Sequence, residues 1–425
     1  MKRLLMIAYH FPPLAGSSGI QRTLRFVQHL PAFGWQPLIL TARKGAYERT
    51  SDDLLQEISP DVVVRRAFAL DAARHLSVRG HYWGATARPD RWASWRFDAV
   101  RQGLAMIRDY QPDAIWSTYP IATAHVVASI LSKKSGLPWI ADFRDPMAHE
   151  GFPSDTLTWE HYRRIEADAA ACARRMVFVT ASAAQTYRRV YPAAAQRIHL
   201  VENGYDEESF KAAERQLPIL EPAALQAPRK LVLLHSGIVY PSERDPTQLF
   251  VALARLRLAG DLKPSELIIR FRASGNEAYL RQLIEALGVS EFIELCPEIS
   301  YVDALSEMLT VDALLILQAS NCNTQIPAKI YEYIRAARPV LGLTDPAGAT
   351  AAAMHAAQMD DQAPLDDADA VARALMVFLN KVLNHQTTPP PLAVVIESSR
   401  RGRTEALAQV LNAACQIEEV PSELR

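Results

Sequence analysis

Short apolar runs alternate with amphipathic segments through the first half of the chain. Buried strands of a parallel sheet give such runs, and helices that pack on the sheet give the segments between them. Seven runs predict β-strands, at residues 4–9, 37–41, 62–65, 114–117, 139–142, 176–180 and 198–201. Five amphipathic segments predict helices, at residues 20–33, 96–110, 122–135, 154–172 and 182–190.

A second series of the same kind begins after Arg229. It predicts strands at residues 231–236, 266–273, 293–295, 313–317 and 340–343, and helices at 247–259, 278–287, 301–309 and 328–336. Alternating strands and helices are typical of a doubly wound α/β domain with a parallel sheet. The chain is therefore predicted to hold two Rossmann-like domains, one after the other.

The predicted domains are separated by a stretch without periodicity. We expect the first domain to span residues 1–205 and the second to span 229–388, with 206–228 as a linker that contains LPILEPAALQAP. The proline run at 389–391 ends the second domain. A terminal helix follows at about 392–416, and we expect it to pack back on the first domain.

Composition narrows the class of protein. Apolar residues make up 49% of the 425, which is typical of a globular protein, and the formal net charge of −1 excludes a global basic footprint for nucleic acid. No apolar run approaches the length of a membrane-spanning helix, and the run at 4–9 is too short for a signal peptide. The four cysteines are scattered without metal-like spacing, and the histidines give no zinc site. We expect a cytoplasmic protein with reduced thiols.

The segment QIPAKIYEYIRAARPVLGL, at 325–343, predicts a loop, a short helix and a strand. Lys329 and Glu332 are three residues apart and lie on one face near the start of the helix. A helix N-terminus beside a lysine suits a diphosphate, and a carboxylate one turn along can accept hydrogen bonds from a ribose diol. The alternative is an ordinary strand–helix connection in which Lys329 and Glu332 form a surface pair.

A glycine turn, FPPLAGSSGIQR, follows the first predicted strand. Gly16 and Gly19 let a backbone approach a ligand closely at the carboxyl end of that strand. The spacing is not G-x-G-x-x-G, so the dinucleotide fingerprint is absent. The alternative is a plain loop in which Ser18 caps the helix.

Three charged residues follow the predicted strand at 139–142. Arg144 can stabilise a phosphate or a leaving group, and Asp142 or Asp145 can orient an acceptor hydroxyl or act as a base. The alternative is a structural Asp–Arg pair and an Asp-Pro helix cap.

The first strand of the second domain ends at His235-Ser236-Gly237. Gly237 and the later Arg244 form a candidate diphosphate site, because arginine binds phosphate bidentately. The alternative is a solvated loop with a pair between Arg244 and Asp245. Glu298 and Ile299 follow another strand of this domain, where backbone groups can clamp a nucleobase.

Residues 65–101 hold eight arginines together with Tyr82, Trp83, Trp92 and Trp95. Arginine and tryptophan together suit an anionic membrane surface. The alternative is a polar connector whose tryptophans pack on the sheet.

With these segments in place, the chain resembles the bacterial family 4 glycosyltransferases, which have the GT-B fold. The resemblance rests on an ordered set: the Gly16–Gly19 loop, Pro89-Asp90 with Trp95, DFRDP, IEADAAACARRMVFVTAS, ENGYD, HSG followed by Arg244-Asp245, and IPAKIYEY with RPVL. It implies a retaining transferase without a metal or other cofactor. It also implies a nucleoside-diphosphate sugar bound in a cleft, mostly on the second domain.

The resemblance also implies roles for single residues. Glu332 matches the ribose-binding glutamate, and Arg244 and Lys329 match the basic pair at the diphosphate, with the backbone at Ile326 and Pro327 nearby. Gly16 and Gly19 match the loop near the phosphates and the acceptor.

The chain departs from the family pattern at two positions. Many members have two glutamates separated by seven residues, and Thr324 stands at the position of the first, which is usually placed at the donor sugar. Gln325 beside it can replace that function. Arg144 stands where many members have a histidine.

The leading hypothesis is therefore a glycosyltransferase of cell-surface polysaccharide synthesis, at the inner face of the membrane. Its substrates would be a nucleoside-diphosphate sugar and a saccharide or polyprenyl-linked acceptor. No nucleic acid partner is expected. The alternatives are a nucleotide-sugar epimerase or hydrolase of the same fold and a catalytically silent GT-B scaffold.

Overall fold

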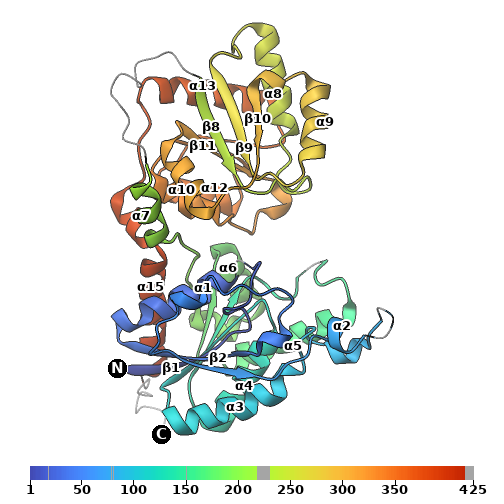
Figure 1. The fold of residues 1–425 in the computed structure, drawn as a ribbon, viewed down its shortest axis with the longest axis vertical. Coiled ribbons are helices and arrows are strands. Elements are labelled where there is room, and N and C mark those ends of the chain that lie inside the picture. The colour runs from blue at the N-terminus through green and yellow to red at the C-terminus, as the bar shows by residue number, and fades with distance from the viewer. Residues whose placement is uncertain (18, 78, 80, 150, 218–229, 417–425) are drawn as a thin grey trace. The chain divides into compact units, whose positions relative to one another are not determined.

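The computed structural model describes the chain except for residues 18, 78, 80, 150, 218–229 and 417–425. The chain forms two compact units (Figure 1). The first unit comprises Met1–Asn203 and Arg400–Arg425, and the second comprises Gly204–Ser399. Each unit is an α/β domain with a parallel sheet.

The first unit is built on a seven-stranded sheet in the order β3-β2-β1-β4-β5-β6-β7. All seven strands predicted from the apolar runs are present. Their bounds are β1 Lys2–Ile7, β2 Trp35–Ala42, β3 Val63–Ala67, β4 Ala114–Thr118, β5 Trp139–Arg144, β6 Arg175–Phe178 and β7 Ile198–Leu200. The strand order reverses between β1 and β4, which is where ligands bind in open α/β sheets.

Helices cover both faces of this sheet (Figure 1). They are α1 Gly19–His29, α2 Ala72–His75, α3 Trp95–Tyr110, α4 Thr123–Ser135, α5 Thr156–Cys172, α6 Ala181–Val190 and α15 Arg400–Cys415. Short 3-10 helices are η1 Leu30–Phe33, η2 Lys44–Ala46, η3 Leu55–Glu57, η4 Gly84–Ala87 and η5 Pro192–Arg197.

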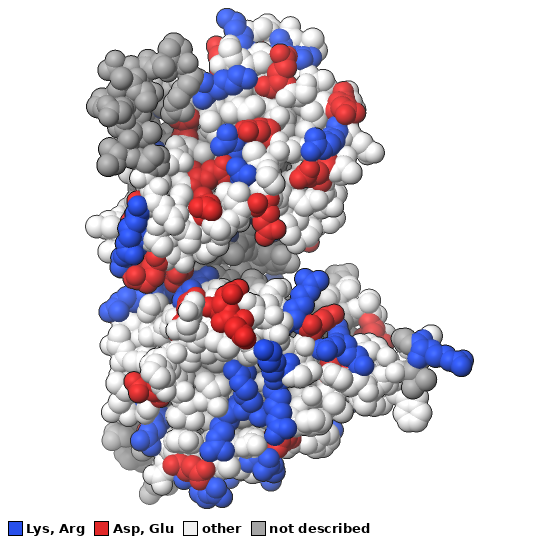
Figure 2. Space-filling model, viewed as in Figure 1, with Lys and Arg blue, Asp and Glu red and all other residues white. Residues whose placement is uncertain are grey.

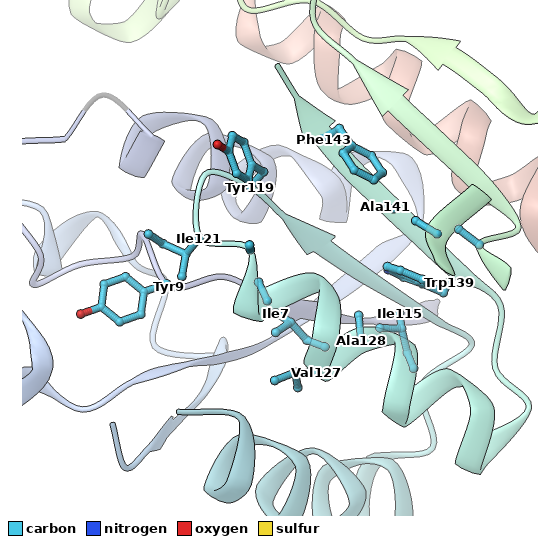
Figure 3. Close-up of a cluster of buried hydrophobic side chains, with 14 of the residues drawn as sticks. Ile7, Tyr9, Ile115, Tyr119, Ile121, Val127, Ala128, Trp139, Ala141 and Phe143 are labelled. Carbon is cyan, nitrogen blue, oxygen red and sulfur yellow. The ribbon is translucent and has the colours of Figure 1, made fainter. Parts of the chain in front are cut away.

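The strands of the first unit are apolar at successive positions because alternate side chains enter two different cores. On one face, Ile7 and Ile115 pack with Trp139, Phe143 and the helix α4 (Figure 3). On the other face, Met6 and Trp116 pack with side chains of α1 and α15. Burial on both faces explains why the pattern is a continuous apolar run rather than an alternation.

The second unit has a six-stranded sheet in the order β10-β9-β8-β11-β12-β13. The strands are β8 Leu231–Ser236, β9 Leu267–Arg272, β10 Ile293–Cys296, β11 Ala313–Gln318, β12 Val340–Thr344 and β13 Gln362–Ala363. The helices are α7 Glu207–Arg215, α8 Thr247–Ala259, α9 Glu277–Leu287, α10 Tyr301–Thr310, α11 Lys329–Ala336, α12 Ala349–Ala356, α13 Ala368–Leu383 and α14 Leu392–Glu397, with 3-10 helices η7 Ser290–Phe292 and η8 Ser320–Cys322. Here the strand order reverses between β8 and β11.

The structure differs from the sequence prediction at the domain boundaries. The expected linker at 206–228 begins with helix α7, which is capped by Asp206 and buries Phe210 in the core of the second unit. Most of LPILEPAALQAP lies outside the described residues. The expected terminal helix at 392–416 is two helices, since α14 belongs to the second unit and α15 contacts α1 of the first.

Candidate active site

In the first unit, the loop after β1 brings glycine, histidine and arginine into contact. A Cβ atom on Gly19 would lie 2.5 Å from Nδ1 of His10 and 2.8 Å from Nη1 of Arg144, so only glycine allows this approach. Gly16 has a φ of +79°, a backbone conformation that favours glycine. Ser17 Oγ lies 3.0 Å from Nδ1 of His10. The predicted cap Ser18 is outside the described residues.

Arg144 lies at the end of β5, where the strand is irregular. The register with β6 shifts between Asp142 and Arg144, and Arg144 has a φ of +61°. Its Nη1 lies 3.5 Å from the carbonyl oxygen of Tyr119, and no carboxylate of the described residues forms a salt bridge with it. Burial, followed by the charge of Arg22, lowers the pKa of Arg144. An arginine placed this way suits an anionic ligand.

Asp142 has a structural partner that the sequence did not reveal. Its buried carboxylate accepts hydrogen bonds from Arg22 Nε at 2.9 Å and Nη2 at 3.0 Å, and from Thr118 Oγ1 at 3.1 Å. Arg22 also donates to the carbonyl oxygens of Val201 and Glu202. This ion pair ties α1 to the ends of β5 and β7, so we assign Asp142 to the structure rather than to the chemistry.

Asp145, unlike the buried Asp142, is exposed to solvent. The pKa of Asp145 is raised, mainly because protein atoms desolvate its carboxyl group, and the nearby Arg144 and Arg22 only partly oppose this rise. The backbone N–H of Asp145 donates to the carbonyl oxygen of Phe143 at 2.7 Å. Asp145 is therefore the carboxylate of the DFRDP segment that remains open to a ligand.

A cavity of about 280 Å³ lies against the glycine loop. Its lining combines aromatic, charged and loop residues: Tyr9, His10, Leu14, Ala15, Gly16, Ser17, Glu48, Arg49 and Trp92. The ring of Tyr9 packs on Trp92 with a centroid distance of 4.7 Å. Burial, followed by the charge of Arg144, lowers the pKa of His10 to about 4, so its imidazole is neutral at pH 7. Neither His10 nor this cavity was predicted.

In the second unit, Lys329 meets the loop after β8. Its Nζ lies 3.1 Å from Nε2 of His235, and a Cβ atom on Gly237 would lie 3.3 Å from that Nζ. The hydroxyl of Tyr333 accepts the backbone N–H of Ser236 at 3.1 Å and so ties this loop to α11. Burial lowers the pKa of Lys329 to about 7, with a further lowering by Arg244 and an opposing effect of Glu332.

Arg244 lies close to this lysine but is not paired with its sequence neighbour. Its Nη1 donates to the carbonyl oxygen of Ile238 at 3.2 Å, and its guanidinium lies 5.3 Å from the centroid of the Tyr240 ring. Asp245 instead accepts hydrogen bonds from Thr247 and Tyr279 near the start of α8. The predicted alternative of an Arg244–Asp245 pair is therefore wrong.

Glu332 lies one turn into α11 and is bound from α10. Its Oε1 accepts a hydrogen bond from the hydroxyl of Tyr301 at 2.7 Å. Tyr301 directly follows the loop that contains Glu298 and Ile299, so this loop lies next to α11. Glu298 is exposed and Ile299 is partly exposed. The contact from Tyr301 was not predicted, because the two residues are far apart in the sequence.

The backbone just before α11 was predicted to lie near the diphosphate, and its residues suit that role only in part. Pro327 has no N–H to donate, and its carbonyl oxygen accepts the N–H of Ile330 at 3.0 Å in the first turn. Ile326 is partly exposed, and Thr324 and Gln325 are exposed beside it. Helix α11 has no side-chain cap, so its N-terminus can receive an anion.

Most arginines between residues 65 and 101 are bound within the first unit. Arg91 pairs with Asp71, Arg101 with Asp98 and Arg88 with Asp155, and Arg66 and Arg74 donate to backbone carbonyls. Trp95 is buried, as the alternative of a polar connector predicts, whereas Trp83 is 84% exposed. On the face shown in Figure 2, basic and acidic residues occur on both units, as the near-zero net charge leads one to expect.

Within the described residues, no group of three or more His, Cys, Asp and Glu side chains can hold a metal ion. None of the described helices has both the length and the apolar character that crossing a membrane needs.

Comparison with known proteins finds a similar domain for most of the first unit. Residues 18–204 match the model of the glycosyl transferase 4-like domain. A search of curated proteins found no match. The family match includes Gly19, the DFRDP segment and strands β2 to β7, and it begins after β1 and Gly16.

Solved structures resemble the chain over nearly its whole length. A trehalose-phosphate synthase from Burkholderia xenovorans, in complex with glucose-6-phosphate, has a TM-score of 0.63 and 13% identity, covering 96% of this chain and 100% of that one. A glycosyltransferase from Rickettsia africae has a TM-score of 0.62 and 12% identity, covering 97% and 98%. Anabaena HepE, in complex with UDP and glucose, has a TM-score of 0.61 and 14% identity, covering 97% and 100%.

At these identities the structural neighbours establish the fold, and the family match establishes the kind of domain. Both agree with the two parallel-sheet units and with the loops at the carboxyl ends of their strands. The chain is therefore a glycosyltransferase with the GT-B fold, and its residues 18–204 are similar to the glycosyl transferase 4-like domain.

Proposed function

We propose that the chain transfers a glycosyl group from a nucleoside-diphosphate sugar to a saccharide or lipid-linked acceptor in cell-surface polysaccharide synthesis. The observation that carries the proposal is the cluster of Lys329, Arg244 and Gly237 at the strand-order reversal of the second unit. Two cations, a loop without a Cβ atom and a helix N-terminus meet there, and together they suit a diphosphate.

The nucleoside would bind on the same side of the second unit. The Glu332 carboxylate lies one helical turn beyond Lys329 and would accept hydrogen bonds from a ribose diol. The loop with Glu298 and Ile299 lies next to α11 through Tyr301, so its backbone can contact the base. A uridine nucleotide is the first to test, because the related HepE structure contains UDP.

The proposed chemistry is retaining and needs no metal ion. The bond from the anomeric carbon to the diphosphate breaks, the acceptor oxygen bonds to the same face of that carbon, and its proton passes to the leaving phosphate. Arg244 and Lys329 would stabilise the charge of the departing diphosphate. Arg22 already binds the carboxylate of Asp142, so Asp142 does not act as a nucleophile in the proposed mechanism.

The acceptor would bind to the first unit. The cavity of about 280 Å³ beside the glycine loop offers Trp92 and Tyr9 as apolar walls and Glu48 and Arg49 as polar ones. Arg144, which forms no salt bridge with a carboxylate of the described residues, lies next to Gly19 and would orient a phosphate or the reacting hydroxyl. The exposed Trp83 is the side chain that best supports a peripheral membrane contact at the cytoplasmic face.

A catalytically silent scaffold remains the competing function, because Thr324 replaces a glutamate that many family members have. The test is a thermal-shift screen of the full chain with UDP, GDP, ADP, CMP and TDP, with and without Mg²⁺. A ligand that binds only the native state raises the melting temperature. We expect one nucleotide to give a shift that does not depend on Mg²⁺.

The variant Glu332→Ala should reduce that shift, whereas Glu285→Ala, an exposed position on α9, should leave it unchanged. The matching nucleotide sugar should then release its nucleotide only when an acceptor is present. Release without acceptor would favour a hydrolase or an epimerase. The absence of a shift with all five nucleotides would favour the silent scaffold.

A further inference from the structure

His235 lies in β8 with both ring nitrogens bound. The residue is completely buried. Its Nδ1 is 3.0 Å from the carbonyl oxygen of Leu315 in the neighbouring strand β11. A carbonyl oxygen only accepts hydrogen bonds, so Nδ1 must carry the proton and Nε2 is left as an acceptor.

Nε2 faces an amine from another element. The Nζ atom of Lys329, at the start of α11, lies 3.1 Å away and is the donor of this hydrogen bond. Ninety-four residues separate the two side chains in the sequence. Gly237 also lies next to the amine, because a Cβ atom there would be 3.3 Å from Nζ. The amine of Lys329 is therefore adjacent to both a histidine and a glycine.

We propose that His235 is a positioning residue for Lys329: its Nε2 accepts a hydrogen bond from the amine and holds it beside Gly237, where the diphosphate of the donor binds. This inference rests on the proposed function. It adds a residue that touches neither the donor nor the acceptor and acts through the lysine alone.

The arrangement favours binding for two physical reasons. A lysine side chain has four rotatable bonds, and ordering it before the ligand arrives reduces the entropy lost on binding. One hydrogen bond to His235 leaves the remaining N–H groups of the ammonium for phosphate oxygens. Burial and the charges of Lys329 and Arg244 lower the pKa of His235 well below 6.5, so the imidazole stays neutral and does not repel the ammonium.

The competing view is that His235 only fills the core below the loop. Two substitutions separate these roles. The amide of His235→Asn can still donate to Leu315 but offers no acceptor to Lys329, whereas His235→Gln places an amide oxygen near the position of Nε2. A third variant, Lys329→Met, removes the amine and keeps the length of the side chain.

The experiment is a double-mutant cycle on the full chain. The dissociation constant of UDP, or of whichever nucleotide gives the largest thermal shift, is measured by calorimetry for His235→Asn, Lys329→Met and the double variant. Melting temperatures without nucleotide show whether each variant folds. Residues that act as one unit give non-additive losses.

We expect His235→Asn to weaken binding about tenfold in the wild-type background and to have no further effect when Lys329→Met is present. His235→Gln should bind more tightly than His235→Asn. Equal weakening by His235→Asn in both backgrounds would overturn the positioning role and leave the proposed function intact. If the wild-type chain binds none of the five nucleotides, both the proposed function and this inference are wrong.

Discussion

At the scale of single residues, the two units share an arrangement. Each places a histidine, a glycine and a cation in contact at the carboxyl edge of its sheet: His10 with Gly19 and Arg144 in the first unit, and His235 with Gly237 and Lys329 in the second. Burial lowers the pKa of both histidines. Neutral imidazoles can lie against cations without repelling them, so the positive charge stays available for anions.

The pKa of Lys329 predicts how nucleotide binding depends on pH. Without ligand this pKa is about 7, so the amine is partly neutral at pH 7.5. A bound diphosphate favours the ammonium form and raises the pKa, so binding should take up a proton. Affinity should therefore fall as the pH rises above 7, by at most tenfold per pH unit.

Calorimetry in two buffers with different ionisation enthalpies, at pH 8, measures this proton uptake. The variant Lys329→Met is the control and should show less uptake than the wild-type chain, because the titrating amine is gone. The same uptake in both proteins would show that another group titrates.

At the scale of secondary-structure elements, the start of α1 depends on one glycine. Gly19→Ala would place a Cβ atom 2.5 Å from the ring of His10, so the ring, Arg144 or the helix start must shift. A displacement of about 1 Å at a reacting site can cost about 100-fold in rate. We expect a loss of transfer activity of about 10- to 100-fold with a small change in melting temperature.

The matched control for this variant is Gly45→Ala in η2. A Cβ atom at Gly45 would meet nothing within 4 Å, and its φ is not in the left-handed region. Its transfer rate should equal that of the wild-type chain. A normal rate for Gly19→Ala would mean that the contact with His10 and Arg144 is not needed for transfer.

The elements that the sequence predicted well are those with burial on both faces. Strands such as β11 and β12 are apolar at every central position, so they stand out as runs. Helix α7 was assigned to a linker because most of its residues are polar, although Phe210 anchors it in the core. β13 has two residues, which is too short for any periodic signal.

The sequence predicted which loops form the candidate site, but it did not predict which side chains contact one another there. Loops at strand ends can be found from the order of strands, and Gly237, Arg244 and Lys329 do come together. Arg22 and Asp142 are 120 residues apart, and no local pattern indicates which arginine binds which carboxylate. The same holds for Lys329 and His235, which pair only because β8 and α11 are adjacent in the fold.

At the scale of the whole molecule, the first unit is completed by the end of the chain. Leu407 and Leu411 of α15 are completely buried in the core that includes Leu24 and Val27 of α1. These side chains are expected to contribute as much to stability as residues in the middle of an ordinary core.

The variant Leu407→Ala should therefore lower the free energy of unfolding of the first unit by about 2–5 kcal/mol. All seven tryptophans lie between residues 35 and 159, so tryptophan fluorescence during denaturant unfolding reports on this unit alone. The control Leu392→Ala, at a residue that is 73% exposed in α14, should change that unfolding by no more than about 0.5 kcal/mol. A loss below about 1 kcal/mol for Leu407→Ala would contradict the packing of α15.

The return of α15 to the first unit also has a consequence during protein synthesis. The apolar face of α1 cannot be covered by α15 until residues 204–399 have been translated. This takes about 10 to 40 s at 5–20 residues per second. Throughout that interval the nascent first unit exposes a surface to which a chaperone can bind. Synthesis and emergence of α15, rather than completion of the seventh strand, is thus the event that lets this unit reach its final stability.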